Sequence, residues 1–391
     1  MPLSWLIFGI SGLFSLLSLW IVVSAPTFFL LPLGIAAPEL SPWLLVANAI
    51  ALGVNLVYGK NLNFALLCSL LSLGLSLLPL VQFPSANQRM AAEMEARLGK
   101  DYLNPVSQSL QTQLRPRPLV LSEVFSGIPL GAVRCQRGIV FANPDGVNLT
   151  LNSYLPPLPG KYPGIVIIYG GAWQTGSPER GESMSRYLAA QGYAAIAISY
   201  RHAPQYQFPA QLEDVQAALS YIQDHADELE VNLQRMAVLG RSAGAQLAML
   251  AAYQGNLMPL RAVVNYYGPA DLQRGYNELP FPDPINVRGV LKAFLGGSPE
   301  ERPELYRKAS PIHALRPGLP PTLLVYARRD RLVKVEFGRG LYEALRDSQN
   351  VAVWLEIPWA EHAFDAVFSG IGNQLSLYYV ERFLAWALAE G

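Results

Sequence analysis

The sequence of 391 residues contains only two cysteines and four histidines, and it has no excess of charge of either sign. Cys68 and Cys135 lie far apart, so they form neither a disulfide framework nor the closely spaced ligands of a metal site. The 29 Lys and Arg residues balance 29 Asp and Glu residues. This balance excludes the basic surface that nucleic-acid-binding proteins use, so we expect no nucleic-acid partner.

Charge is almost absent from the first 88 residues, where only Glu39 and Lys60 are charged. The mean hydropathy of the whole chain is +0.21, which is high for a soluble protein, and the other charges all lie downstream. The two parts of the chain are therefore expected to lie in different solvents. We interpret residues 1–88 as a membrane anchor.

Three apolar runs occupy this anchor, at residues 3–24, 41–58 and 63–83. Each has about the 20 residues with which a helix crosses roughly 30 Å of hydrocarbon, so we predict about three transmembrane helices. A cleaved signal peptide is an alternative for the first run, but no basic residue precedes it. A buried helical hairpin of a soluble protein is a second alternative.

The composition changes after the third run. Residues 89–134 mix Ala, Glu, Met and Arg at helical spacing and then become rich in Pro, Gln and Ser, which predicts a surface helix followed by a linker. Since residues 1–88 are interpreted as anchor rather than core, a chain that begins near residue 100 is expected to be soluble and active.

Residues 135–391 alternate short apolar runs with helical patterns. Near-continuous apolar runs, such as those at 164–169 and 235–240, are typical of a parallel sheet that is covered on both faces. A hairpin that turns at residues 144–146 comes first. This order predicts an α/β domain with a mostly parallel, doubly wound sheet.

A Gly-x-Ser-x-Gly motif spans residues 240–244, between an apolar strand and an Ala-rich helix. Gly240 and Gly244 leave room for a strained turn that exposes the hydroxyl of Ser242, and the helix N-terminus favours negative charge beside it. An ordinary strand-to-helix turn is the alternative. The context predicts Ser242 as a nucleophile.

The stretch Tyr-Gly-Gly-Ala-Trp, which ends at Trp173, directly follows an earlier strand. Small residues let backbone N–H groups approach an oxyanion, and those of Gly171, Ala172 and Ala243 are the natural donors. Trp173 and the Pro-rich segment 271–309 are expected to wall the substrate pocket.

A nucleophilic serine needs a base, and the base needs an orienting acid. His362 follows the last strand and fits the order serine, acid, histidine. Asp330 follows the preceding strand and is the matching acid, while Asp365 is a competing acid close to His362. The remaining histidines are interpreted as a turn residue, a solvated helix residue and a residue of a Pro-flanked segment: His202, His225 and His313.

Residues from about 135 to 391 resemble the α/β-hydrolase fold, in the esterase/lipase branch similar to hormone-sensitive lipase and bacterial carboxylesterases. Four stretches carry the resemblance, in order: YGGAW, SYRHAPQYQFPAQLEDVQAAL, GRSAG, and ARRD with EHAF. The family usually has His where this chain has Tyr169. Arg201 and Asp214, in the second stretch, are expected to form a structural pair.

The resemblance implies a carboxylesterase or lipase-like serine hydrolase that forms an acyl-enzyme on Ser242 and needs no metal or organic cofactor. The substrate would be a small-molecule or lipid-like ester. Two alternatives stay open: an amidase or formamidase that uses the same triad, and a non-catalytic, membrane-anchored binding protein on a hydrolase fold.

The basic residues around the apolar runs bear on the orientation of the expected integral membrane protein. Lys60, between the second and third runs, favours an external hydrolase. Arg89, Arg97 and Lys100 follow the third run and favour the opposite orientation. The count of three against one favours a cytoplasmic hydrolase.

Overall fold

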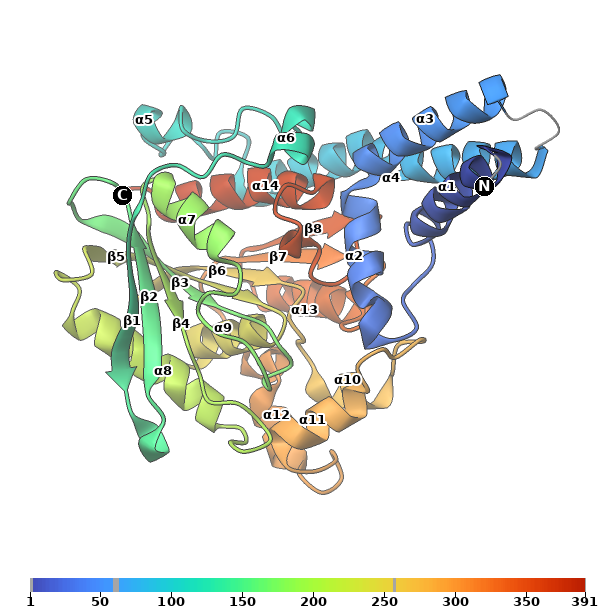
Figure 1. Ribbon diagram of the computed structural model, residues 1–391. Coiled ribbons are helices and arrows are strands. Elements are labelled where there is room, and N and C mark those ends of the chain that lie inside the picture. The colour runs from blue at the N-terminus through green and yellow to red at the C-terminus, as the bar shows by residue number, and fades with distance from the viewer. Residues whose placement is uncertain (1–2, 59–62, 256–257, 391) are drawn as a thin grey trace.

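The computed structural model describes residues 3–58, 63–255 and 258–390 (Figure 1). Its centre is an eight-stranded sheet in the order β1-β2-β4-β3-β5-β6-β7-β8. The pairs β1–β2 and β2–β4 are antiparallel, and all the others are parallel. The strands are β1 (Arg134–Ala142), β2 (Leu149–Leu155), β3 (Tyr162–Ile168), β4 (Ala194–Ile198), β5 (Val231–Arg241), β6 (Leu260–Tyr266), β7 (Thr322–Ala327) and β8 (Ala352–Ile357).

Helices cover both faces of this sheet, with α7 and α14 on one face and α8, α9 and α13 on the other (Figure 1). Three further helices, α10, α11 and α12, lie in the segment of the chain that connects β6 to β7. The bounds are α7 (Glu182–Ala190), α8 (Ala210–Asp224), α9 (Ala243–Gln254), α10 (Leu272–Asn277), α11 (Val287–Leu295), α12 (Pro303–Ala309), α13 (Val335–Asp347) and α14 (Ile371–Ala387). Short helices are η1 (Phe28–Leu30), α5 (Gln108–Gln111), α6 (Leu121–Ser126), η2 (Pro144–Gly146), η3 (Pro311–Ala314) and η4 (Phe364–Ala366).

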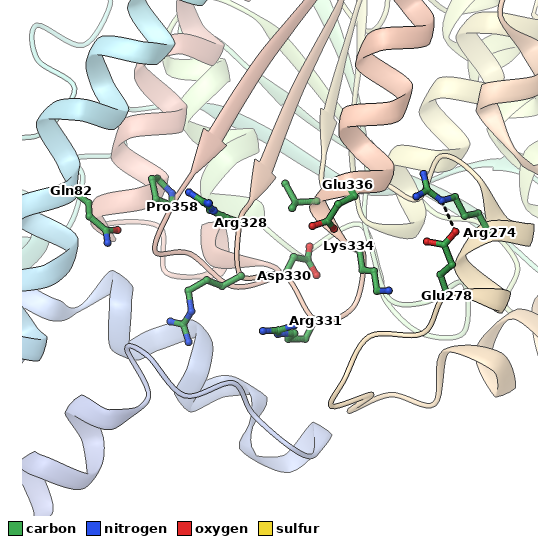
Figure 2. A pocket seen from close by; sticks show the side chains of 11 residues that line it. Gln82, Arg274, Glu278, Arg328, Asp330, Arg331, Lys334, Glu336 and Pro358 are labelled. Carbon is green, nitrogen blue, oxygen red and sulfur yellow. Dashed lines mark hydrogen bonds and ion pairs between the residues drawn. The ribbon is translucent and has the colours of Figure 1, made fainter.

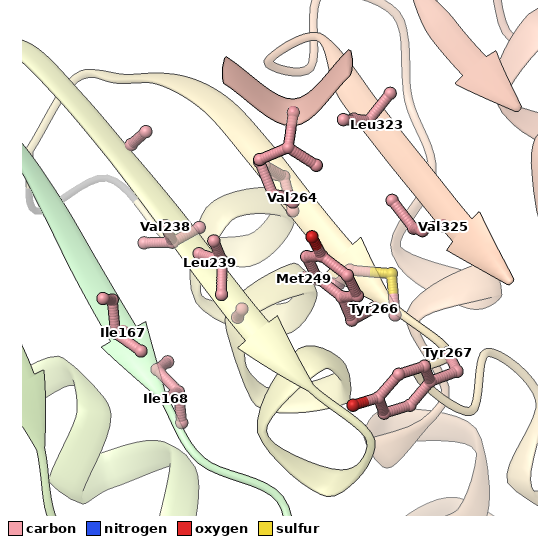
Figure 3. Packing of buried hydrophobic residues seen from close by; sticks show 14 of the residues in the cluster. Ile167, Ile168, Val238, Leu239, Met249, Val264, Tyr266, Tyr267, Leu323 and Val325 are labelled. Atoms are coloured by element: carbon pink, nitrogen blue, oxygen red, sulfur yellow. The ribbon is translucent and has the colours of Figure 1, made fainter. Parts of the chain in front are cut away.

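The core lies between the central strands and these helices. Figure 3 shows Val238, Val264 and Leu323 on neighbouring strands, and all three side chains are fully buried. Apolar runs that are buried on both faces are what a parallel sheet requires. The predicted α/β class and its mostly parallel sheet are confirmed.

Four α-helices lie in the first 98 residues: α1 (Leu3–Leu19), α2 (Leu31–Glu39), α3 (Ser41–Tyr58) and α4 (Asn63–Leu98). α1, α3 and the first half of α4 form a bundle that projects from the rest of the molecule (Figure 1). Large apolar side chains face outward from this bundle; Leu16, Ile50 and Leu67 are 56%, 64% and 62% exposed.

Polar side chains lie inside the same bundle. The side-chain amide of Asn48 donates to the hydroxyl oxygens of Ser18 (2.9 Å) and Ser76 (3.1 Å), which joins the three helices. Asn55 makes the equivalent pair of bonds to Ser11 and Ser69, both 2.9 Å long. This distribution, polar inside and apolar outside, is the reverse of that in a water-soluble bundle.

The lengths of the helices differ from the three spans that the sequence suggests. Within the described residues, α4 is the one helix that is long and apolar enough to cross a membrane alone, and its apolar window is 28% buried. The η1–α2 segment and α3 qualify only as a pair bent by 80°, and α1 is shorter. Lys60 lies outside the described residues. The count of three spans stays a prediction.

The second half of α4 forms the helix that the sequence predicts after the third apolar run, but one face of this helix is buried in the hydrolase domain. α4 continues without interruption to Leu98, and Phe83, Met90 and Met94 are at most 8% exposed within the hydrolase core. The hydroxyl of Tyr342 donates to the Glu93 carboxylate at 2.6 Å. The apolar residues recur every three or four positions, so one face of the helix is buried while Glu and Arg occupy the other.

The predicted linker is also attached to the domain, through Glu381 of α14. This carboxylate is 1% exposed and accepts hydrogen bonds from the backbone N–H of Arg115 (2.8 Å) and the hydroxyl of Tyr187. Burial raises the pKa of Glu381 from its ordinary value of 4.5 to about 7. The folded state therefore favours the protonated carboxyl.

A pH dependence of stability follows from this shift. The contribution of Glu381 is fully present below pH 4.5 and is lost as the pH rises through about 7. We expect the free energy of unfolding to fall between pH 5 and pH 8 by on the order of 3 kcal/mol from this group. Urea unfolding in detergent at both pH values should show a shallower pH dependence for Glu381→Gln than for the wild type, and equal slopes would contradict this account.

Candidate active site

Ser242 lies at the turn between β5 and α9. Its backbone has φ +51° and ψ −122°, a combination that L-residues rarely adopt and that stores strain. The backbone N–H of Ser242 donates to the carbonyl of Tyr266 at 2.9 Å, which fixes the turn against β6. The strained turn that the motif predicts is therefore present.

The two motif glycines allow this turn because there is no space for a side chain at either position. A Cβ on Gly240 would lie 2.4 Å from the Cα of Ala245. A Cβ on Gly244 would lie 2.3 Å from the carbonyl oxygens of Ile168 and Tyr169. The close approach of α9 to β3 and β5 thus requires glycine at both positions.

The structure brings Ser242, His362 and Asp330 together from the ends of three parallel strands. Nε2 of His362 lies 3.0 Å from Oγ of Ser242, and Nδ1 lies 2.7 Å from Oδ2 of Asp330. His362 and Asp330 are each 4% exposed. The other oxygen of Asp330 accepts the backbone N–H groups of Leu332 and Val333, both at 2.8 Å, so the carboxylate is held in one orientation.

The competing acid, Asp365, makes different contacts. Its carboxylate forms an ion pair with Arg241 and accepts a hydrogen bond from the hydroxyl of Tyr267. Arg241 and Asp365 are 7% and 7% exposed, so this pair is a buried structural link between the serine loop and η4. The geometry favours Asp330 as the partner of His362.

Glu361 is a feature of the site that the sequence reasoning missed. Its Oε1 accepts the backbone N–H of Arg331 (2.7 Å) and that of His362 (3.2 Å), so it ties the acid loop to the histidine loop. Burial and the neighbouring Asp330 raise the pKa of Glu361 to about 7. Its position directly before the histidine was the available signal in the sequence.

The expected oxyanion donors line the same cavity as Ser242 and His362. Gly171 and Ala172 have positive φ values, +146° and +54°, and neither backbone N–H finds an acceptor in the part of the chain that the structure describes. Ala243 is the first residue of α9, where backbone N–H groups are also free of intrahelical partners. All three donors are available to a ligand.

The loop that carries these donors is held by Tyr169, the residue that replaces the usual histidine. Its hydroxyl lies 2.9 Å from Nε2 of His202, and its ring stacks on Tyr200 with centroids 4.5 Å apart. His202 is therefore part of the support of this loop rather than a simple turn residue. Arg201 and Asp214 form the predicted structural pair, with Nη2 of Arg201 2.8 Å from Oδ1 of Asp214.

The cavity has a volume of about 720 Å³ and mainly apolar walls. Trp173 lines it as predicted; its Nε1 donates to Gln246 at 2.9 Å, and its ring stacks on Phe294 at 4.1 Å. The segment 271–309 also contributes, through Leu272, Ile285, Val287, Val290 and Leu291.

A third wall comes from the N-terminal region, which the sequence interpretation treats as anchor alone. Leu31, Pro32 and Ile35 of α2 line the cavity together with Phe28. The described residues contain no group of three His, Cys, Asp or Glu side chains that could hold a metal ion. The site thus combines a serine–histidine–aspartate chain, free N–H donors and an apolar cavity.

Comparison with known proteins agrees with this geometry. Residues 151–345 match the family model described as BD-FAE, an esterase family of the α/β-hydrolase fold. This domain belongs to the esterase branch of the α/β-hydrolases. The sequence resemblance is confirmed.

Two curated relatives of this α/β-hydrolase come from Mycobacterium tuberculosis. The chain is 32% identical to a protein named probable carboxylic ester hydrolase LipM, over 58% of this chain and 55% of LipM. It is also 32% identical to the esterase LipC, over 52% of this chain and 53% of LipC. The chain thus spans about half the length of these relatives.

A solved structure of similar fold is the esterase Est2 of Thermogutta terrifontis with butyrate bound. The identity is 26% and the TM-score is 0.50, and the match covers 66% of this chain and 92% of Est2.

Proposed function

We propose that this α/β-hydrolase is a membrane-anchored serine esterase that cleaves a carboxylic ester through an acyl-enzyme on Ser242. The observation that carries the proposal is the continuous hydrogen-bond chain from Ser242 through His362 to Asp330 at the wall of an apolar cavity. The named activities of the relatives support the same reaction.

The geometry supports a two-step acyl transfer. Nε2 of His362 accepts the proton of Ser242 as Oγ bonds to the ester carbonyl carbon, and Asp330 stabilises the resulting imidazolium. The carbonyl oxygen becomes an oxyanion, which the N–H groups of Gly171, Ala172 and Ala243 stabilise. His362 then returns the proton to the leaving alkoxide, and water releases the acyl group by the same route.

The cavity supports an uncharged acyl or aryl ester of modest size, because apolar side chains form most of its walls. Butyrate bound to the Thermogutta esterase is the acid product of such an ester. An amidase or formamidase would use the same groups on a C–N bond. The names of the relatives favour the ester, and parallel turnover of matched ester and amide substrates separates the two activities.

The N-terminal bundle supports membrane anchoring by its reversed polarity. Its large apolar residues face outward, whereas Asn48 and Asn55 donate hydrogen bonds to serines of neighbouring helices in the interior of the bundle. Polar groups between helices make such hydrogen bonds in lipid. Arg89, Arg97 and Lys100 follow the apolar part of α4 and favour a cytoplasmic hydrolase. Protease digestion of right-side-out vesicles tests this orientation, since cleavage of the hydrolase from outside would reverse it.

The paired variants Asp330→Asn and Asp365→Asn test the proposed triad. Asp330→Asn should lower kcat for a short p-nitrophenyl ester by roughly 10³- to 10⁴-fold, because the carboxylate no longer orients and stabilises His362. Asp365→Asn should instead lower stability, by about 3 kcal/mol, because it leaves Arg241 buried without its charge partner. A larger loss of kcat in folded Asp365→Asn than in Asp330→Asn would assign the acid to Asp365.

A further inference from the structure

A second cleft, of about 580 Å³, lies behind the triad acid and is lined by basic residues. Figure 2 shows Arg328, Arg331 and Lys334 on the segment that follows β7, and Gln82 of α4 across the cleft. With Arg329, four cationic side chains occupy seven consecutive positions, from 328 to 334. The balanced net charge of the chain gives no sign of this local concentration.

Most of these cations form no ion pair with a carboxylate. Among the described residues, Arg329, Arg331 and Lys334 make no ion pair, and Arg328 has one long contact, 3.9 Å, to Glu356. The acidic residues of the cleft do not compensate: Glu278 is paired with Arg274 at 2.9 Å, and Asp330 is directed to His362. Glu336 is exposed. The cleft therefore keeps an excess of positive charge.

The cleft lies at the level where the exposed apolar surface of α4 ends. On α4, Val81 is 70% exposed, and the exposed Gln82 that follows it lines the cleft. After α1, the exposed residues Val22 and Val23 are followed by Ser24, and the exposed aromatic residues Phe28 and Phe29 follow in η1. If the bundle spans a bilayer, this level is the headgroup region.

The basic segment is joined to the chain at this same level. A side-chain N–H of Arg329 donates to the backbone carbonyl of Ile21, and Nε of Arg331 donates to the hydroxyl of Ser24 at 3.1 Å. Arg329 and Arg331 thus lie beside the segment that follows α1, and Gln82 of α4 lines the same cleft. Basic pockets that bind lipid headgroups between membrane helices have this arrangement.

We propose that this basic cleft binds the phosphate of an anionic phospholipid headgroup and so holds the hydrolase domain against the membrane surface. Arginine and lysine form short, charge-assisted hydrogen bonds to phosphate oxygens, and a phosphodiester carries the single negative charge that the uncompensated cleft lacks. The cleft is separate from the cavity of Ser242, and the headgroup takes no part in ester cleavage.

Lipid retention by the full-length protein tests this proposal. The protein is purified in dodecylmaltoside micelles that contain equal amounts of dioleoyl phosphatidylglycerol and dioleoyl phosphatidylcholine, and native mass spectrometry measures the lipid retained. All samples carry Ser242→Ala, so the readout is independent of ester hydrolysis. The test variant is Arg328→Gln with Lys334→Gln, which leaves the contacts of Arg329 and Arg331 in place. The matched control, Arg307→Gln with Lys308→Gln, removes two exposed cations from α12.

We expect the parent protein and the control to prefer phosphatidylglycerol about tenfold or more, and the test variant to lose most of this preference. Thermal unfolding without added lipid checks that the test variant is folded. Equal retention of the two lipids by the parent protein, or an unchanged preference in the test variant, would overturn the proposal. Stabilisation by 10 mM inorganic phosphate without any lipid preference would also overturn it, because the site would then bind a free anion.

Discussion

Ser242→Ala is expected to lower kcat for hydrolysis of p-nitrophenyl butyrate by about 10⁴-fold or more without unfolding the protein. The hydroxyl of Ser242 is hydrogen-bonded to His362 and is the group of this chain that forms the acyl-enzyme. Alanine lacks the hydroxyl but fits into the same turn. His362→Ala should lose a similar factor, because residues that act as one unit do not contribute additively.

The control for this result is Ser183→Ala, which removes the hydroxyl of another serine that lines the cavity. It makes none of the triad contacts, so its kcat should stay within a few-fold of the wild type. Substantial turnover by Ser242→Ala, with the same ester and a comparable thermal midpoint, would mean that a different group is the nucleophile.

Removal of residues 1–98 is expected to abolish the native fold of the hydrolase domain. Met90 and Met94 are 2% and 0% exposed in its core, and loss of a buried side chain of this size costs about 2 to 5 kcal/mol. The free energy of unfolding of a domain is only about 5 to 15 kcal/mol. Loss of the whole buried face of α4 would therefore remove more stabilisation than the domain has. Circular dichroism and ester turnover measure the outcome.

A shorter truncation that begins at Asn63 separates the role of α4 from that of the other helices. It keeps the buried half of α4 but removes α2, whose residues Leu31 and Ile35 line the cavity. We expect this protein to fold and to show a raised KM for esters that fill the cavity. Full activity of a chain that begins at residue 99 would contradict this account and return α4 to the role of a dispensable anchor.

The sequence predicted the sheet and the proposed triad because their patterns are local. Apolar runs of strand length define the order of the strands, and the position of Ser242 between a strand and a helix gives its motif meaning. His362 and Asp330 follow from their places after the last two strands, and the structure places them 2.7 Å apart.

The integration of the N-terminal region could not be predicted in the same way. A lipid-facing helix and a helix buried in a protein core have similar, mainly apolar compositions. The pattern of Met, Ala, Glu and Arg after residue 83 fits either a surface helix or a helix with one buried face. The available signal was Glu39, the single described charge before residue 88. Its carboxylate is fully buried and accepts the backbone N–H groups of Gly372 (2.7 Å) and Asn373 (3.2 Å), at the start of α14.

Labelling with a fluorophosphonate probe tests the central claim, that Ser242 is an activated nucleophile, most directly. The probe reacts covalently with a serine that is activated by the other groups of an active site. The folded, full-length protein should react, and mass spectrometry should place the adduct on the peptide that contains Ser242. Ser242→Ala should not react under the same conditions. Failure of the intact wild type to react, or an adduct on a serine other than Ser242, would contradict the assignment of this protein as a serine hydrolase that acts through Ser242.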